Sequence, residues 1–356
     1  MQGMNISLTG YEGAILWRFF DSVSSAVSMR MLRGSPPGEE NLTFLLCELL
    51  DESSTDLHKL EYSLSSAKEE LEKSDAGITI DVGIETHEHT KHFESKYSGA
   101  DLGIVLSIDH PILGKSRRAV LVQAKKLFAK SKSREFILHS EYSSYDKGQA
   151  GFLKELAQRF ETWNSVFYLW YNPPTSGFAE ADARIIRAYE AHDTSLAPFY
   201  GRIHKYFDEM IEMGFPLFVG GRNTIGHMNR EDEDKAREWR ARQPALRISA
   251  LDTVLSLTEG GGAPRLKLLY EALVTRSDRI SFSPFADFLL LALANSRYGS
   301  SNDQWVQLAQ GQTVPMPRLK QGSQDRLSSH LDELQSPPIP RHTMTLTVRS
   351  TLPSIG

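Results

Sequence analysis

The most informative part of this sequence is residues 99–126, GADLGIVLSIDHPILGKSRRAVLVQAKK. It contains two apolar runs on either side of a polar turn, and such runs are typical of strands buried on both faces. Asp101 precedes the first strand, and the second strand ends in Gln123-Ala124-Lys125. Because successive residues of a strand point to opposite faces, Gln123 and Lys125 share a face. If the strands pair, a carboxylate, an amide oxygen and an ammonium group meet at one end of a sheet. This predicts a site for a divalent cation and an activated water.

The segments around this hairpin predict an α/β fold. Leucines at helical spacing predict helices over residues 39–52 and 56–73, and alternating apolar residues predict a strand over 78–84. A further helix is expected over 145–163, followed by a buried strand over 165–171. The core order is therefore αβββαβ, around a mixed central sheet.

Four segments follow from the changes in composition along the chain. Residues 1–37 form a lead-in, and residues 38–175 form the α/β domain. Residues 176–320 are expected to form a mainly helical C-terminal domain for oligomerisation, partner binding or sensing. Residues 321–356 are polar and Pro-rich, which predicts an extended tail.

Composition excludes several classes of protein. The 356 residues carry a net charge of −5, so any nucleic-acid binding must rest on a local patch. The single cysteine, Cys47, excludes a disulfide framework and a Cys-based zinc site. No apolar run approaches the length needed to cross a membrane, so a cytoplasmic protein without membrane contact is expected.

The charged side chains between Lys115 and Arg134 are all basic. One interpretation is a solvated basic loop beyond the strand, and the other is a surface that contacts phosphates. On an acidic chain, a basic block next to Asp101 and Lys125 favours phosphate contacts. The predicted nucleic-acid-binding residues of this block are Lys115, Arg117, Arg118, Lys126, Lys130 and Lys132.

The arrangement of Asp101, Gln123 and Lys125 resembles the PD-(D/E)xK, or restriction-endonuclease-like, nuclease superfamily. The resemblance is to the D…QxK variant, in which Gln replaces the middle acid, and it covers residues 38–172. It implies a Mg²⁺- or Mn²⁺-dependent endonuclease that hydrolyses phosphodiester bonds of DNA, with RNA as the alternative. It also implies an acid from the first helix, for which Glu40 is chosen.

Several roles follow from this resemblance. Asp101, the Gln123 amide oxygen, the Ala124 backbone carbonyl and Glu40 would hold the metal ion, and Lys125 would hold and help deprotonate the attacking water. Glu48 and Glu94 are the other candidate acids, whereas Glu39 is interpreted as an acid that favours the helix N-terminus. Gln149, early in the helix after Lys125, would orient that lysine or a backbone phosphate.

The resemblance extends to effector nucleases of bacterial antiphage defence, in which a nuclease domain is fused to a sensor or assembly domain. It implies a regulated effector that forms a homo-oligomer or binds partner subunits through residues 176–320. The competing hypothesis is a non-catalytic module that binds nucleic acid or a partner through a degenerate nuclease fold.

Overall fold

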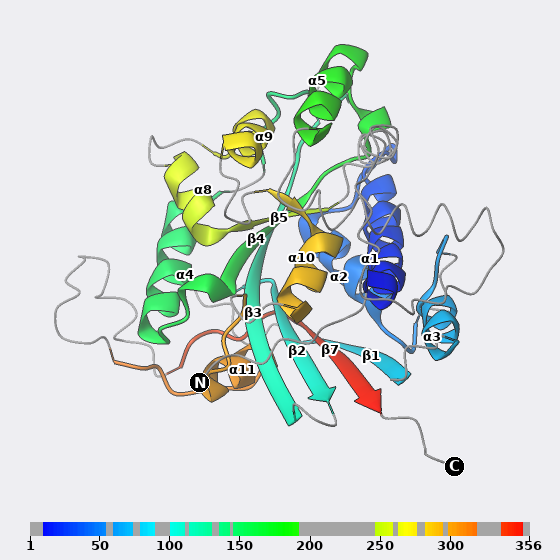
Figure 1. The fold of residues 1–356 in the computed structure, drawn as a ribbon. Coiled ribbons are helices and arrows are strands. Elements are labelled where there is room, and N and C mark those ends of the chain that lie inside the picture. Colours follow the sequence, from blue (N-terminus) through cyan, green and yellow to red (C-terminus); the bar gives the residue numbers. More distant parts are fainter. Residues whose placement is uncertain are drawn as a thin grey trace.

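A seven-stranded mixed sheet runs through the part of the protein that this computed structural model describes (Figure 1). The strand order is β1-β7-β2-β3-β4-β5-β6. The strands are β1 (Thr79–Glu88), β2 (Leu102–His110), β3 (Gly114–Lys126), β4 (Val166–Tyr171), β5 (Arg247–Ala250), β6 (Ser283–Pro284) and β7 (His342–Thr351). The described residues are 10–54, 60–73, 79–89, 100–110, 114–129, 135–142, 145–191, 246–258, 263–275, 282–294, 298–318 and 336–351.

The predicted hairpin is confirmed. Strands β2 and β3 pair antiparallel, with Leu102 opposite Val122, and β3 pairs in parallel with β4, with Gln123 opposite Tyr168. Parallel strands need a crossover connection, which helix α4 (Lys147–Arg159) provides. The sheet is therefore mixed, as predicted, and the α/β class is confirmed.

Helices cover both faces of this sheet. They are α1 (Gly10–Arg30), α2 (Glu39–Leu50), α3 (Leu64–Glu72), α4 (Lys147–Arg159), α5 (Glu180–Ala191), α8 (Leu251–Thr258), α9 (Leu266–Thr275), α10 (Phe285–Ala294) and α11 (Asp303–Ala309). Between Glu39 and Tyr171 the helices and strands follow the predicted order. Among the described residues, none of these helices is long and apolar enough to cross a membrane.

Alternating side chains of β4 show which helices lie on which face. The Phe167 ring packs against Phe288 of α10 at 4.6 Å between centroids, and the Tyr171 hydroxyl donates to Thr43 of α2. On the opposite face, the Tyr168 ring lies 6.4 Å from Tyr145, just before α4. Because neighbouring residues of a strand point to opposite faces, α2 and α10 cover one face and α4 covers the other (Figure 1).

Helix α11 packs directly on the central hairpin. The Trp305 indole N–H donates to the Ala119 carbonyl of β3 at 3.1 Å. A Cβ atom at Gly103 of β2 would collide with the Ala309 carbonyl at the end of α11. Only glycine allows this close approach, so Gly103 fixes the position of α11 on the sheet.

Residues 10–30, predicted as part of a lead-in, form a core helix instead. The side chains of Ile15, Phe19 and Val23 are fully buried, and α1 packs against α10. The Trp17 indole N–H donates to the Asp287 carboxylate of α10 at 2.9 Å. The apolar residues of this segment recur at helical spacing, and burial extends around most of the helix, because Trp17 and Ser24 are buried as well.

The second half of the chain joins the same sheet rather than standing apart from it. Strand β5 pairs antiparallel with β4, and β6 pairs with β5. Helices α8 and α10 pack against these strands, while α5 and α9 pack against each other through Tyr189 and Tyr270. The described part of residues 176–320 contains more helix than strand and shares its core with the preceding α/β segment. A separate helical domain stays a prediction.

The end of the chain differs most from the prediction. Residues 342–351, predicted to lie in an extended tail, form β7 between β1 and β2. It pairs antiparallel with β1 and parallel with β2, and it buries Met344, Leu346 and Val348. These residues alternate with polar ones, which is the pattern of a strand. The Pro-rich composition just before them, in residues 337–340, concealed that pattern.

Candidate active site

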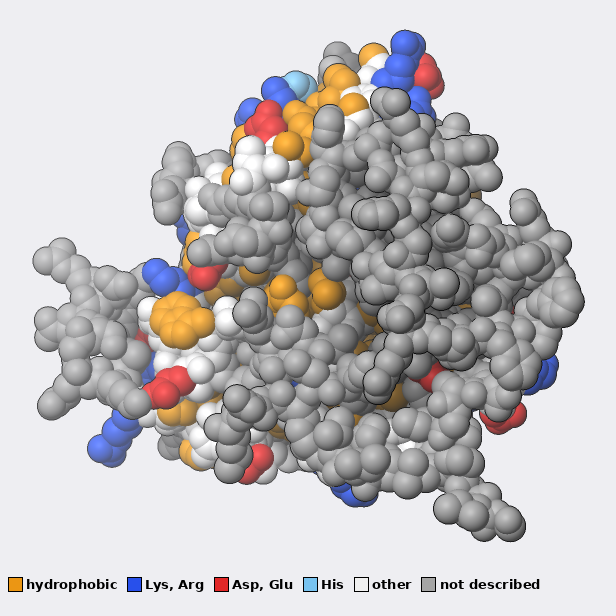
Figure 2. Space-filling view, in the orientation of Figure 1, with side chains coloured by type: hydrophobic (Ala, Val, Ile, Leu, Met, Phe, Trp, Pro, Cys, Tyr) orange, Lys and Arg blue, Asp and Glu red, His pale blue; other side chains and the backbone are white. Residues whose placement is uncertain are grey.

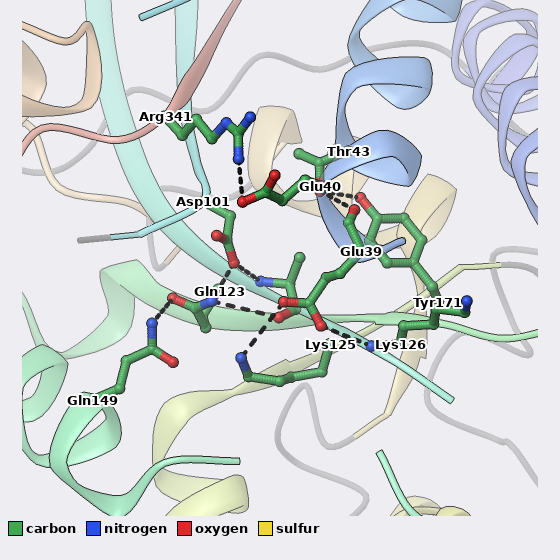
Figure 3. Close-up of polar contacts among 11 residues, drawn as sticks. Glu39, Glu40, Thr43, Asp101, Gln123, Lys125, Lys126, Gln149, Tyr171 and Arg341 are labelled. Carbon is green, nitrogen blue, oxygen red and sulfur yellow. Dashed lines mark hydrogen bonds and ion pairs between the residues drawn. The ribbon is translucent and has the colours of Figure 1, made fainter. Parts of the chain in front are cut away.

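Asp101 and Gln123 meet where β2 begins and β3 approaches its end. Continuing the β2–β3 register by one residue places Asp101 opposite Gln123. The Asp101 Oδ2 atom accepts hydrogen bonds from the Gln123 side-chain amide and from the Ala124 backbone N–H, the latter at 2.7 Å (Figure 3). The structure therefore brings together the acid and the amide that the sequence predicted.

Lys125 lies in the same place and is paired with Glu39. Its side chain is on the Gln123 face of β3 and is only 4% exposed, and its Nζ atom lies 3.6 Å from Glu39 Oε1. The other carboxylate oxygen of Glu39 accepts the Lys126 backbone N–H at 3.1 Å. Glu39 thus contacts two consecutive residues of β3 (Figure 3).

Glu40, the acid predicted for the metal site, forms an ion pair with Arg341. Consecutive residues of a helix point about 100° apart, so only one of two adjacent acids can face β3. In α2 that acid is Glu39, and the interpretation of Glu39 as a helix-terminus residue alone missed its contacts. Glu48 lies near the opposite end of α2, and Glu94 lies outside the described residues.

A short chain of hydrogen bonds holds Glu39 in position. The Tyr171 hydroxyl of β4 donates to the Thr43 hydroxyl at 2.9 Å, and Thr43 donates to the Glu39 backbone carbonyl at 3.1 Å. Both hydrogen bonds lie at the end of the sheet that carries the candidate site (Figure 3). The first turn of α2 is therefore tied to the strand that neighbours Lys125.

The side chain of Gln149 contacts Gln123. Its side-chain amide donates to Gln123 Oε1 at 2.8 Å. Asp146 caps α4 by accepting the Gly148 backbone N–H, which fixes the first turn that carries Gln149. Gln149 thus orients the Gln123 amide so that its NH₂ group faces Asp101.

Burial and a neighbouring acid change the acidity of Asp101. Burial, followed by the negative charge of Glu39, raises its pKa from 3.8 to about 7. The charges of Lys125 and Arg341 and the hydrogen bond from the Ala124 N–H act in the opposite direction. A carboxylate whose charge is disfavoured by burial and by a neighbouring acid is one that a bound cation would stabilise.

The residues present fit a hard divalent cation. Among the described residues there is no cluster of three or more His, Cys, Asp or Glu side chains placed to hold a metal. Mg²⁺, however, is commonly bound by one or two carboxylates together with substrate phosphates and waters. Asp101, Glu39 and the Ala124 carbonyl would supply such a set. The Ala124 carbonyl accepts only a long hydrogen bond from the Gln123 amide, at 3.4 Å, whereas the Gln123 amide oxygen accepts from Gln149 at 2.8 Å.

The predicted basic surface is not one patch. Arg118 is buried and donates to the Leu293 carbonyl at 3.0 Å, and Lys126 is buried and donates to the Pro37 carbonyl at 2.6 Å. Lys115 and Arg117 are exposed, but they lie at the opposite end of β3 from Lys125. Lys130 and Lys132 lie outside the described residues. In Figure 2 the visible Lys and Arg side chains of the described residues are scattered and mixed with acids.

Arg341 is a site residue that sequence reasoning missed. The Arg341 N–H donates to the Ala100 carbonyl at 3.3 Å, and the His342 N–H donates to the Asp101 carbonyl at 2.9 Å. The start of β7 therefore holds the backbone around Asp101. The alternation of Met344, Leu346 and Val348 with polar residues was the signal that could have revealed this strand.

The chain was also compared with known proteins. Comparisons with protein-family models, with curated proteins and with solved structures found no match. The candidate site is therefore defined by its own geometry: two carboxylates, Asp101 and Glu39, beside Lys125 and the Gln123–Gln149 amide pair at one end of a mixed sheet.

Proposed function

We propose that this protein is a metal-dependent nuclease of the PD-(D/E)xK type that hydrolyses phosphodiester bonds, most simply those of DNA. The observation that carries the proposal is the meeting of Asp101, Gln123 and Lys125 with Glu39 at one end of β3. Burying a lysine beside two acids costs free energy, so such a group is characteristic of a site rather than of a core.

In this proposal Glu39 has two tasks, as proton acceptor and as metal ligand, and each other side chain has one. Lys125 Nζ holds the attacking water through its N–H donors, and Glu39, 3.6 Å away, accepts the proton that the water loses. Gln123 fixes the orientation of Asp101, and Gln149 fixes Gln123. Asp101, Glu39 and the Ala124 carbonyl would hold Mg²⁺ or Mn²⁺. When bound, the cation would polarise the scissile phosphate and offset charge on the leaving oxygen.

The test is cleavage of plasmid and single-stranded DNA by the purified protein, with Mg²⁺ or Mn²⁺ and with a chelator as control. We expect metal-dependent cleavage by the wild-type protein and its loss in Asp101→Asn, which keeps the side-chain shape but removes the charge. Full cleavage by Asp101→Asn would contradict the proposal. RNA of the same sequence, assayed in parallel, separates the two substrate classes.

The second candidate is a non-catalytic module on a degenerate nuclease fold. It is favoured by two observations: Gln123 Oε1 is already bound to Gln149, and Lys125 is already paired with Glu39. DNA binding without cleavage under any metal condition would support this candidate. The roles of residues 176–320 in assembly, and of the whole chain as a defence effector, stay predictions from the resemblance.

A further inference from the structure

Arg341, the residue just before strand β7, lies at the candidate site. Continuing the parallel β2–β7 register by one residue from Leu102 and His342 places Arg341 beside Asp101, on the same face of the sheet. The Arg341 backbone N–H donates to the Ala100 carbonyl at 3.3 Å. The positive charge of Arg341 lowers the pKa of Asp101, which opposes the raising effect of burial. Arg341 is therefore close enough to act on groups that bind at Asp101.

The guanidinium group is held by carboxylates at the rim of the site. It forms an ion pair with Glu40 of α2, and its Nη2 atom lies 3.7 Å from Glu88 of β1 (Figure 3 shows the pair with Glu40). The Glu40 side chain is 58% exposed and that of Arg341 is 26% exposed. The buried Nε atom of Arg341 has no hydrogen-bond acceptor among the described residues. The main partner of the group is thus solvent-exposed, and exposed ion pairs exchange partners at little cost.

Arg341 differs from the cations that the sequence predicted to contact phosphate. Arg118 and Lys126 are buried against backbone carbonyls, and Lys115 and Arg117 lie at the far end of β3. Arg341 combines a place beside Asp101 with partial exposure. An arginine fork can bind two phosphate oxygens at once, which a lysine cannot do.

We propose that Arg341 binds a phosphate group of the substrate beside Asp101, and that Glu40 holds Arg341 in the free protein and competes with that phosphate. This inference rests on the proposed function and names a substrate contact within it. It also gives Glu40 a role different from metal binding: removing its charge should release Arg341 and strengthen phosphate binding.

The experiment measures the affinity for a fluorescein-labelled DNA oligonucleotide, single-stranded and duplex, by fluorescence anisotropy with Mg²⁺ present. A Lys125→Ala background prevents cleavage during the measurement. We expect Arg341→Ala to weaken binding about tenfold and to reduce the salt slope by about one, because one phosphate contact is lost. Glu40→Gln should tighten binding several-fold, and Arg341→Ala with Glu40→Gln should bind like Arg341→Ala alone.

Arg349→Ala is the matched control. Arg349 is also on β7 and also pairs with a carboxylate of β1, Asp81 at 3.5 Å, but it lies eight positions further along the strand, about 26 Å away. This variant should bind as tightly as the background protein. Arg341→Lys, which keeps the charge but loses the fork, should show an intermediate affinity.

The outcomes separate this inference from the proposed function. Weaker binding by Glu40→Gln, or a Glu40→Gln effect that persists without Arg341, would overturn the inference and return Glu40 to the metal site. No DNA binding by the background protein would also overturn it. The expected binding pattern, together with wild-type protein that does not cleave, would uphold Arg341 as a phosphate contact while refuting the nuclease. Cleavage by the wild-type protein without this pattern of DNA binding would support the nuclease and refute Arg341 as a phosphate contact.

Discussion

The two ends of strand β3 carry the same kinds of residue in opposite surroundings. At the Gly114 end, Lys115 is 82% exposed and pairs with Asp109 at 2.8 Å. At the Lys126 end, Lys125 is 4% exposed and pairs with Glu39, with Asp101 close by. Lys115 and Lys125 lie ten residues apart, which is about 33 Å along a strand. A run of like charges in the sequence therefore becomes either a solvated edge or a buried site, depending on which elements pack over it.

Substitution of the two lysines should differ most in its effect on the rate of DNA cleavage. Lys125→Ala should lower the rate of DNA cleavage by about 10²–10⁴-fold, because a group that positions the nucleophile and aids proton transfer is lost. Lys115→Ala should leave the rate unchanged, since this side chain lies at the other end of the strand. Single-turnover cleavage of a labelled duplex measures both. A large loss of cleavage rate in Lys115→Ala would instead indicate that the substrate lies along the whole of β3, so that both of its ends take part in binding.

Two adjacent arginines of β3 sharpen the same contrast through stability. Arg118 is buried and donates to the Leu293 carbonyl, so Arg118→Ala should lower the free energy of unfolding by about 2 kcal/mol. Arg117 is exposed, and Arg117→Ala should change the free energy of unfolding by less than about 0.5 kcal/mol. Urea titration of both variants tests this. Equal effects would mean that the burial of Arg118 contributes nothing to stability.

The pH dependence of stability reports on the buried end of the hairpin. The pKa of Asp101 is raised from 3.8 to about 7 by burial and by Glu39, so the folded protein holds this proton more tightly than the unfolded chain. The stabilisation is fully present below pH 4 and is lost as the pH rises to about 7, by at most about 1.4 kcal/mol per pH unit. Asp21, whose pKa burial also raises to about 7, adds to the wild-type slope.

In Asp101→Asn, the free energy of unfolding should therefore decrease less between pH 4 and 7 than in the wild-type protein. The decrease that remains is due to Asp21. Urea titrations at several pH values in this window measure it. The matched control is Asp109→Asn, which removes a carboxylate from the exposed end of the same hairpin. An unchanged slope in Asp101→Asn would show that Asp101 is not buried in its neutral form.

The smallest expected effect concerns two tyrosines of β4, next to the buried end of β3. Tyr171 donates to Thr43, so Tyr171→Phe should cost about 1 kcal/mol of stability. The Tyr168 hydroxyl is buried without a hydrogen-bond partner among the described residues, so Tyr168→Phe should be neutral or slightly stabilising. Thermal unfolding distinguishes them. A cost for Tyr168→Phe as large as that for Tyr171→Phe would reveal a partner for this hydroxyl, such as a bound water.

Local patterns were sufficient to predict the central hairpin and the placement of three site residues. The apolar runs of β2 and β3 and the alternation after Val122 put Asp101, Gln123 and Lys125 together, because both signals depend only on strand geometry. Core helices and strands from Glu39 to Tyr171 were predicted for the same reason. The restriction-endonuclease-like identity of that core stays a prediction.

Contacts between distant segments decided the rest. Whether Glu39 or Glu40 faces β3 depends on the rotation of α2, which is set by packing and by the bonds from Tyr171 and Thr43. Likewise, composition alone does not show which lysines and arginines become buried against carbonyls. The helix of residues 10–30 was overlooked because its partner, α10, lies far along the chain.

The α/β class, the β2–β3 hairpin and the grouping of Asp101, Gln123 and Lys125 follow from local patterns of the chain, chiefly the period of two along a strand. Only the tertiary structure placed Glu39 at Lys125, Gln149 on Gln123 and Arg341 beside Asp101. The contacts of Glu39 and Gln149 depend on how α2 and α4 pack against β3, which no local pattern specifies. The place of Arg341 depends on β7, whose neighbours β1 and β2 lie more than two hundred residues earlier in the chain. Register between such distant strands is fixed by what the whole sheet buries.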